Sequence, residues 1–462
     1  MDRATVEPTV TEMPGARARR WADYHQSVAA PSTHLYDFVW DHRRDAVGPF
    51  CTDVDGNVLL DFTSHVAAAP LGYDNPELRE RLDAFGAVDP LKIAGQDFYA
   101  AGGWPPEDPD LPGPTQLMHR LADLTADYGL DTVFLSNSGA EAVENAIKVC
   151  YARREGAKYA ITFDGAFHGR TLGALSLNRS KAIHRRGFPE LAGVTAMPYC
   201  EDRTCTAATC DCGFFVGDGT SRLRDAFGPE GAIDPDEVAY VIFEPIQGES
   251  GYRVPSEAFV AELGSVCREY GVPLVADEVQ TGLGRTGEWW GVDHYDADPD
   301  VVAAGKALRV GATVANRETF PAEKARLSST WGAGDLLSSL VGALTIDVIR
   351  EEGLLTNARV RGEALRDRLA AADPPFVLDV RGKGLLVGVE FDARDRRDAV
   401  VEACLHRGLL TLPGGHRTLR LLPPLDVTER EIEMGATLLL DAISDPAVRR
   451  ASPHPDAGDE AS

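Results

Sequence analysis

Lysine is scarce in this chain of 462 residues, and long apolar runs are absent from it. We count 7 lysines, so arginine supplies most of the 46 basic side chains, against 72 acidic ones and a net charge of −26. No stretch of 18 or more apolar residues occurs, so we expect no membrane-spanning helix. The amino-terminal segment lacks the apolar core of a secretory signal, so we expect a cytoplasmic protein.

The charge balance bears on partners and on environment. Nucleic-acid binding needs basic side chains that neutralise phosphates, so the strongly acidic balance argues against such a partner. Many carboxylates with few lysines keep a surface hydrated and self-repelling in a high-salt cytoplasm, so we predict a halophilic protein. A GC-rich genome with an ordinary acidic bias is the alternative.

The order of apolar segments predicts two domains. Short, almost wholly apolar strands alternate with helices from about residue 80 to 330, which is typical of a mostly parallel sheet covered on both faces. We assign residues 76–334 to this large α/β domain. Residues 21–75 and 335–445 are predicted to form a smaller α+β domain made from both ends of the chain. The polar ends, 1–20 and 446–462, are predicted to be disordered.

Two charged residues end predicted buried strands. Asp277 closes the apolar run in PLVADEVQTG, and Lys306 follows the run in VVAAGKALR. This pair is what pyridoxal phosphate requires, because a lysine amine forms a Schiff base with its aldehyde while a carboxylate keeps its pyridine nitrogen protonated. We therefore predict Lys306 and Asp277 as catalytic residues of a pyridoxal phosphate enzyme. A lysine extending to solvent and a solvated acidic turn are the alternatives.

Other candidate groups also follow predicted strands, where open α/β sheets bind their ligands. In SNSGAEA, Ser138, Gly139 and Ala140 begin a helix, whose free backbone N–H groups suit a phosphate. A plain helix cap is the alternative. Glu244 ends a further strand, in YVIFEPIQGES.

A planar cofactor ring needs covering groups on its faces and edge. We predict that Phe167 stacks on the ring with His168 beside it, although Phe167 taken alone is more typical of a core residue. In DEVQ, the alternation of an extended segment puts Val279 on the same side as Asp277, where it covers the opposite ring face. Gln280 is predicted to donate to the ring oxygen.

Taken together, these motifs resemble those of the class III (omega) aminotransferases. The resemblance covers roughly residues 35–440 and rests on the ordered stretches SGAEAVENAIK, GAFHGRTLGALSL, EPIQGES, VADEVQTGLGRTG, the GK that ends at Lys306, and SSTWG. It implies the aspartate-aminotransferase-like fold (fold type I) and a homodimer with shared active sites. It also implies that Thr330 binds the cofactor phosphate of the neighbouring subunit. Arg420 is implied to bind a substrate carboxylate, pairing with Glu244 when an omega-amine donor is bound and leaving it for 2-oxoglutarate.

Within this class the sequence most resembles the L-lysine 6-aminotransferases, through LLDFTSHVAAAPLGYDNPEL, the residues that follow GAFHGRT, RLSSTWG and LDVRGKGLLVG. That resemblance gives Arg170 a role at the substrate carboxylate. The predicted function is transfer of the terminal amine of an omega-amino or diamino acid, L-lysine first, to 2-oxoglutarate, which gives glutamate.

Two stretches depart from the family pattern and leave the donor open. ALRVGA follows Lys306 in place of a Gly-rich turn ending in Pro, and WGAG follows Thr330 in place of GGN. The other donors are 4-aminobutyrate, ornithine, acetylornithine and diaminobutyrate. An amino-acid racemase, aminomutase or decarboxylase on the same frame, and a non-catalytic binding module, are the remaining alternatives.

Four of the eight cysteines, Cys200, Cys205, Cys210 and Cys212, fall within the stretch CEDRTCTAATCDC. In a cytoplasmic chain such cysteines do not indicate a disulfide framework. Soft thiolates at short spacing suit tetrahedral zinc, so we predict a structural zinc clip for an inserted loop. Unliganded thiols and an iron–sulfur cluster are the alternatives.

Overall fold

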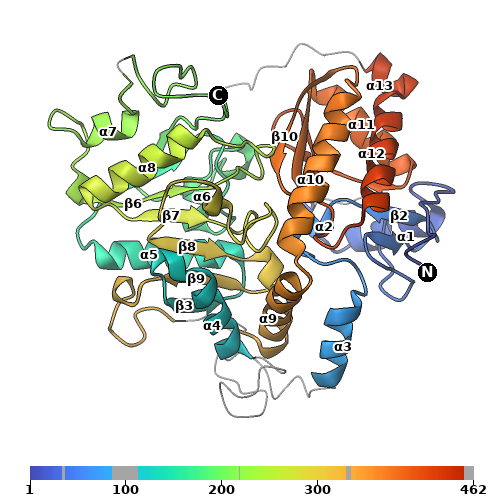
Figure 1. The fold of residues 1–462 in the computed structure, drawn as a ribbon, viewed down its shortest axis with the longest axis horizontal. Helices are drawn as coiled ribbons and strands as arrows, with labels where there is room; N and C mark the ends of the chain where they lie inside the picture. The colour runs from blue at the N-terminus through green and yellow to red at the C-terminus, as the bar shows by residue number, and fades with distance from the viewer. Residues whose placement is uncertain (34–36, 86–112, 218, 329–333, 452–462) are drawn as a thin grey trace. The chain divides into compact units, whose positions relative to one another are not determined.

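The computed structural model describes residues 1–33, 37–85, 113–217, 219–328 and 334–451 (Figure 1). The chain divides into two compact units. The larger unit is Glu77–Leu355, and the smaller unit joins Met1–Pro76 to Thr356–Ser462. Among the helices of the described residues, none is long and apolar enough to cross a membrane.

A seven-stranded sheet forms the centre of the larger unit, in the order β3-β9-β8-β7-β6-β4-β5. β5, β4, β6, β7 and β8 are parallel neighbours, while β9 runs antiparallel to both β8 and β3. The predicted α/β fold with a mostly parallel sheet is thereby confirmed. The strands are β3 (Thr132–Ser136), β4 (Tyr159–Phe163), β5 (Val194–Met197), β6 (Val238–Phe243), β7 (Leu274–Asp277), β8 (Val301–Ala304) and β9 (Gly311–Ala315).

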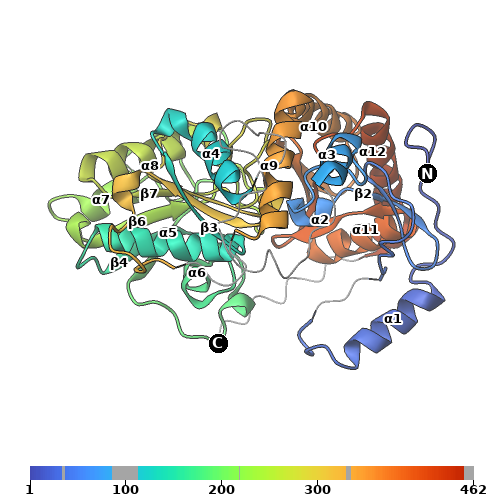
Figure 2. The ribbon, with the colours of Figure 1, turned by 90° about the horizontal axis from the view of Figure 1, so that it is seen from below.

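Helices cover both faces of this sheet, and alternate strand residues enter two different cores. In β8, Val301 and Ala303 pack with α5, whereas Val302 and Ala304 lie in the cluster that includes residues of α4 and α8. Figure 2 shows α5 on one side of the strands and α4 and α8 on the other. Burial on both faces explains why β6 to β9 are almost wholly apolar in sequence. The helices of this unit are α4 (Pro114–Leu124), α5 (Gly139–Arg153), α6 (Leu172–Leu177), α7 (Arg222–Phe227), α8 (Glu257–Tyr270) and α9 (Leu336–Glu351), after α3 (Pro76–Phe85) at its start.

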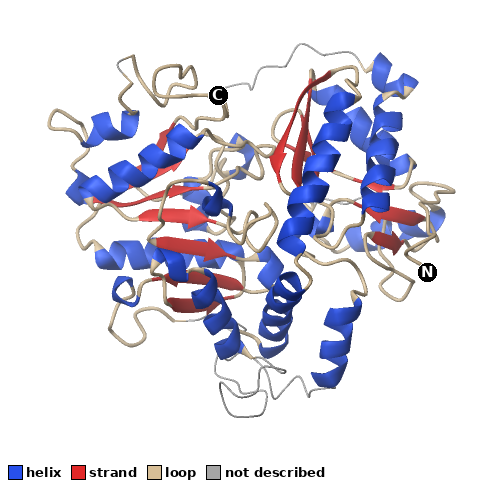
Figure 3. Cartoon of the chain, viewed as in Figure 1, coloured by secondary structure: helices blue, strands red, loops and turns tan. Residues whose placement is uncertain are grey.

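The smaller unit is an α+β structure with one mixed three-stranded sheet and one antiparallel four-stranded sheet (Figure 3). One sheet has the order β1-β2-β12 and the other β10-β11-β14-β13. Its strands are β1 (Phe50–Thr52), β2 (Val58–Asp61), β10 (Val377–Lys383), β11 (Leu386–Phe391), β12 (Leu409–Leu410), β13 (Leu412–Gly414) and β14 (Thr418–Leu421). Its helices are α1 (Ala16–Gln26), α2 (Ser64–Ala67), α10 (Leu354–Ala371), α11 (Arg394–His406), α12 (Glu429–Ile443) and α13 (Pro446–Arg450).

Helix α9 belongs to the larger unit, so the second boundary between units falls at residue 355 and not at the predicted 334. The reason is its packing. Arg120 of α4 forms a two-bonded ion pair with Asp347 of α9, with N–O distances of 2.8 and 2.7 Å. Gly342 of α9 lies so close to Leu308 that a Cβ on it would be 2.5 Å from the Leu308 carbonyl oxygen.

Both predicted disordered ends require correction. Residues 1–20 lie against the smaller unit: Arg3 donates from Nε and Nη2 to the two carboxylate oxygens of Glu431 at 2.7 and 2.9 Å, and Thr9 pairs with Val58. The predicted carboxyl-terminal tail begins with α13, whose Val448 is buried. The rest of that tail, 452–462, lies outside the described residues.

The Arg3–Glu431 contact yields a stability prediction. Glu431 is almost fully buried, so removing its cationic partner leaves a carboxylate that only local donors satisfy. We expect Arg3→Ala to lower the free energy of unfolding by about 1–3 kcal/mol, measured by thermal denaturation. Arg394→Ala, which removes an exposed pair with Asp398 in the same unit, is the control and is expected to change little. Equal effects of the two variants would contradict the assigned anchoring role.

Candidate active site

Chemically active groups of the larger unit gather at the carboxyl edge of its sheet. Glu244 follows β6, Asp277 ends β7 and Lys306 comes two residues after β8. The turn after β4 carries Phe167 and His168, and Ser138 lies between β3 and α5. Parallel strands bring these turns to one edge, although their residues are far apart in the chain.

Asp277 is a buried carboxylate whose two oxygens are both held. His168 Nδ1 donates to Oδ2 at 2.7 Å, and the backbone N–H of Val279 donates to Oδ1 at 3.1 Å. Asp277 is 4% exposed and His168 3%, so this pair is shielded from water. Each carboxylate oxygen has two lone pairs, so Asp277 retains capacity to accept a further donor such as a pyridinium N–H.

The predicted packing of His168 beside a bound cofactor ring stays a prediction. In the structure the imidazole of His168 contacts Asp277, and among the described residues its Nε2 has no hydrogen-bond partner. The backbone N–H of His168 donates to Asn178 Oδ1 at 2.7 Å, and Asn178 Nδ2 donates to the Gly169 carbonyl at 2.8 Å. Asn178 thus clamps the turn that carries His168, and no sequence signal marked this residue.

The amino end of α5 is pressed against the turn that carries Lys306. A Cβ on Gly139 would lie 2.4 Å from Cγ1 of Val279, and a Cβ on Gly305 would lie 2.9 Å from Cα of Gly139. Only residues without a side chain permit this approach. The close packing brings the start of α5, the segment after Asp277 and the base of Lys306 into one small volume.

Ser138 acts as the N-cap of α5, where its hydroxyl accepts from the Glu141 N–H at 3.2 Å. The capping alternative from the sequence therefore describes the Ser138 side chain. Ser138 is exposed, and Gly139 and Ala140 are half-buried. The helix start remains accessible, and its first backbone N–H groups carry the partial positive charge that favours an anion.

Lys306 stands in a strained backbone conformation. Its φ of 39° lies in the left-handed region, as does the φ of 65° at Arg309, on either end of the short turn η6 (Lys306–Leu308). Such a conformation costs a side-chain-bearing residue of order 1–2 kcal/mol and is held by the surrounding packing. Arg309 belongs to the stretch ALRVGA, in which the sequence departs from the Gly-rich family turn.

Phe167 is half-buried, and the polar side chains of Arg170 and His184 lie next to its ring. The guanidinium carbon of exposed Arg170 lies 5.4 Å from the ring centroid, and the ring of His184 meets it edge-on at 5.4 Å. The Phe167 backbone N–H donates to Glu244 Oε1 at 2.9 Å. The structure therefore ties the position of Phe167 to that of Glu244, and places Arg170 beside both the turn and the solvent.

Glu244 accepts two backbone hydrogen bonds, from Phe167 at Oε1 and from Gly248 at Oε2, each at 2.9 Å. Burial raises the pKa of Glu244 to about 7; nearby His168 opposes the rise and the negative charge of Asp277 adds to it. A carboxyl with this pKa changes charge near neutral pH.

The neighbours of Asp277 in DEVQ have different tasks. Glu278 accepts from the backbone N–H groups of Gly291 and Val292, each at 2.8 Å, and so anchors the following loop. Burial raises the pKa of Glu278 to about 7.

Gln280 lies against Gly248, and its buried Oε1 has no hydrogen-bond partner among the described residues. An amide oxygen can only accept a hydrogen bond, so the predicted donation from Gln280 to the ring oxygen stays a prediction.

Two other residues that sequence reasoning did not single out hold the loop before Phe167. Gln247 Nε2 donates to the Asp164 carbonyl at 2.7 Å, and Ser250 Oγ donates to the Gly165 carbonyl at 2.5 Å. Both lie in the stretch after Glu244, so the turns after β4 and β6 support each other.

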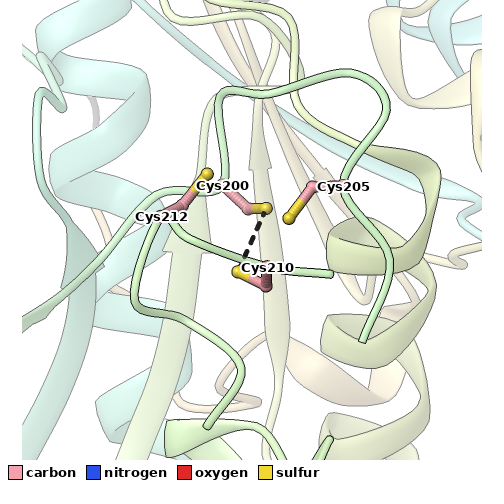
Figure 4. Close-up of side chains that lie close together, drawn as sticks. All are labelled: Cys200, Cys205, Cys210 and Cys212. Atoms are coloured by element: carbon pink, nitrogen blue, oxygen red, sulfur yellow. Dashed lines mark hydrogen bonds between the residues drawn. The ribbon is translucent and has the colours of Figure 1, made fainter. Parts of the chain in front are cut away.

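The remaining predicted residues lie elsewhere. Thr330 falls outside the described residues. Arg420 is on β14 of the smaller unit, where it is buried and donates from Nη2 to the Pro413 carbonyl at 2.9 Å. Its predicted contact with substrate stays a prediction. The four clustered cysteines converge in the segment after β5 (Figure 4).

These residues fit a phosphate-bearing pyridine cofactor. The buried, hydrogen-bonded carboxylate of Asp277 suits the ring nitrogen, and the accessible start of α5 suits the phosphate. Val279 contacts Gly139 and lies near Gly305, at the same edge of the sheet. Lys306 provides the amine. The set contains the groups that pyridoxal phosphate chemistry requires of a protein.

Comparisons with known proteins agree with this chemistry. The family model "Aminotransferase class-III" matches residues 38–443. The alanine/serine racemase of Pyrococcus horikoshii is 31% identical over 457 residues, which cover 94% of this chain and 92% of that protein. The acetylornithine aminotransferase of Archaeoglobus fulgidus is 33% identical over 401 residues, with coverages of 85% and 93%. The solved structure of lysine aminotransferase from M. tuberculosis matches with a TM-score of 0.77 at 29% identity, covering 94% of this chain and 99% of that one.

Glu244 yields a prediction about pH. In the folded state its pKa is about 7 against an ordinary value of 4.5, so its contribution to stability is greatest below the ordinary pKa and is lost as pH rises toward 7. Glutamine cannot titrate. The difference in Tm, Glu244→Gln minus wild type, is therefore expected to rise by a few degrees between about pH 5 and about pH 8.

The matched control is Glu230→Gln, at an exposed surface glutamate. Its difference in Tm from wild type is expected to stay level over the same range. A level difference for Glu244→Gln as well would show that this carboxyl does not titrate near neutrality.

Proposed function

This chain belongs to the class III aminotransferase family, and we propose that it transfers the terminal amino group of an omega-amino or diamino acid to 2-oxoglutarate, giving glutamate. The observation that carries the proposal is the meeting of Lys306, Asp277 and the start of α5 at one edge of the sheet. L-lysine is our first candidate donor.

Pyridoxal phosphate, when bound, supplies an electron-withdrawing ring that stabilises negative charge at the amine-bearing carbon of the substrate. In our proposal Lys306 holds the cofactor through its amine and then acts as the base that moves a proton at that carbon. Asp277, oriented by His168, holds the ring nitrogen in its protonated form. Phe167 and Val279 cover the ring, and the backbone of Gly139 and Ala140 holds the phosphate.

The substrate-binding residues follow from charge. Arg170 and Arg420 are proposed to bind carboxylates of the amino acid and of 2-oxoglutarate, because the guanidinium fork matches a carboxylate with two hydrogen bonds. The exchange of Glu244, which is implied by the family resemblance to neutralise Arg420 when an amine donor is bound, needs Glu244 in its ionised form.

Two observations bear on the choice of donor and reaction. The match to lysine aminotransferase from M. tuberculosis supports L-lysine, whereas the relative from A. fulgidus and an ornithine aminotransferase at 33% identity favour acetylornithine and ornithine. The P. horikoshii racemase covers 94% of this chain, so amino-acid racemisation is the second candidate function. A transaminase needs an amino acceptor, and a racemase does not.

The donor is tested by single half-reactions of purified holoenzyme at high salt. L-lysine, L-ornithine, N-acetylornithine, 4-aminobutyrate and 2,4-diaminobutyrate are mixed with it in turn. We expect L-lysine to convert the visible cofactor band to the near-ultraviolet band of the aminated cofactor, and 2-oxoglutarate to restore the visible band with formation of glutamate. Bleaching by ornithine or acetylornithine alone would move the assignment to that donor.

Lys306→Ala is the control. It cannot form the Schiff base with the cofactor, so we expect it to lack the visible band of the wild-type enzyme. Its half-reaction with the amine donor is expected to be at least about 100-fold slower. A band that no donor bleaches, together with inversion of L-alanine or L-serine without 2-oxoglutarate, would establish racemisation. Absence of a cofactor band from wild-type protein would remove the whole assignment and support a non-catalytic binding module.

We propose further that the enzyme is a homodimer adapted to high salt, as the family resemblance and the net charge of −26 suggest. Sedimentation velocity is expected to give one species of twice the chain mass in molar KCl, and dissociation or unfolding at low salt, where carboxylates repel each other over a longer distance. A monomer in molar KCl would contradict the dimer. Identical behaviour at both salt concentrations would contradict the adaptation.

A further inference from the structure

Four thiols meet at one point in the segment that follows β5. The Sγ atoms of Cys200, Cys205, Cys210 and Cys212 all lie within 4.8 Å of one another, and those of Cys200 and Cys210 are 3.9 Å apart. In Figure 4 the four side chains come from separate parts of one looping segment, and the sulfurs of Cys200, Cys205 and Cys210 face one another. None of the four is in a disulfide.

Cys200 and Cys205 belong to a buried cluster that includes Phe214 and Phe259, and the half-buried Cys210 and Cys212 pack against it. Residues 198–217, all of which the structure describes, form neither helix nor strand, and within 201–213 Cys205 is the one buried residue. Aromatic packing holds the two ends of the segment, where Tyr199 and Phe214 both contact the ring of Phe259, at centroid distances of 5.0 and 4.6 Å. Loops longer than about 12–15 residues without secondary structure of their own are uncommon in compact domains, and the four thiols bring distant parts of this one together.

We propose that Cys200, Cys205, Cys210 and Cys212 bind one structural zinc ion. Tetrahedral zinc–thiolate bonds of about 2.3 Å put neighbouring sulfurs about 3.8 Å apart, close to the separation of Cys200 and Cys210. Sulfurs that all lie within 4.8 Å of one another fit a single ion and are too close together for a cube of several irons and sulfides. On binding, each thiol loses its proton to solvent and donates a lone pair to Zn²⁺, with no change of oxidation state.

Donors around the sulfurs suit a negatively charged tetrathiolate. Ser256 Oγ donates to Cys200 Sγ at 3.4 Å, and the backbone N–H groups of Cys212 and Phe215 donate to Cys210. Outer hydrogen bonds of this kind orient metal ligands and stabilise thiolate charge.

The proposed ion would anchor the segment that carries Glu244 and its neighbours. Tyr199, next to Cys200, donates from its hydroxyl to the Glu244 carbonyl at 3.1 Å. Glu201 pairs with Arg253 at 2.8 Å, and the N–H of Ser256 donates to the Cys200 carbonyl at 3.1 Å. The cysteines themselves take no part in the proposed chemistry, so the inference is independent of the proposed function.

The first test is metal analysis of the wild-type holoenzyme, expressed without an affinity tag and dialysed against EDTA. We expect one zinc per chain, released when a mercurial reagent titrates four thiols. After exchange with Co²⁺, we expect the intense visible bands and sulfur-to-cobalt charge transfer of a tetrahedral thiolate site. The visible cofactor band serves as a separate readout of the active site.

Variants then locate the ion. Cys210→Ser and Cys212→Ser, at the two half-buried positions, are expected to lose zinc, while Cys267→Ala and Cys404→Ala, at cysteines elsewhere, are expected to keep it. A ligand present at 100 times its Kd suppresses the unliganded form about 100-fold, so loss of the ion should raise protease cleavage within 201–212 by about 10- to 100-fold.

Three results would overturn the proposal. The first is wild-type protein free of zinc with four readily titrated thiols. The second is a mass decrease that marks disulfides among the four cysteines. The third is stoichiometric iron with cluster absorbance. Because these readouts come from wild-type protein, misfolding of a variant cannot imitate any of them. Zinc content and thiol titration are read separately from the cofactor band and the donor half-reactions, so failure here and failure of the transaminase assignment are distinguishable.

Discussion

The buried carboxylate of Asp277 is the constraint around which the larger unit is arranged. Taking an ionised carboxylate out of water costs several kcal/mol unless it is paired and hydrogen-bonded. Here His168 and the Val279 N–H supply those partners. His168 reaches Asp277 only because the turns after β4 and β7 meet at one edge, and because Asn178 fixes the His168 backbone. The proposed cofactor site therefore depends on two turns that are over 100 residues apart in sequence.

Close backbone contact complements this charge pairing. Gly139 and Gly305 let the start of α5 touch the segment that carries Lys306, so the helix dipole, the amine and the carboxylate act on one small volume. Lys306 adopts a left-handed backbone conformation at this position, which is unfavourable for a residue with a side chain. Pre-organisation of this kind is typical of active sites, since the packing around the strained residue supplies the energy that holds it.

Two further features link the stability of the unit to its chemistry. Glu244 and Glu278 are both buried, and each fixes a loop by accepting two backbone hydrogen bonds. Glu244 also faces Asp277 and His168 electrostatically, so the group that holds the loop is sensitive to charge at the site. The thiol cluster supports the same region from outside through Tyr199 and Arg253, which connects the proposed zinc ion to the position of Glu244.

The sequence by itself determined the α/β class, the mostly parallel sheet and the positions of Lys306, Asp277, Glu244 and Ser138 at strand ends. Apolar strand runs and helical spacing are local patterns, and a charged residue that closes such a run is visible without a structure. Only the tertiary structure decided that His168 orients Asp277 and that Asn178, Gln247 and Ser250 hold the loops. It also decided that Arg3 and Val6, near the amino terminus, contact α12. It also decided that α9 joins the larger unit and that four thiols converge. These outcomes depend on contacts between distant segments, and a chain's local composition does not encode which distant groups will meet.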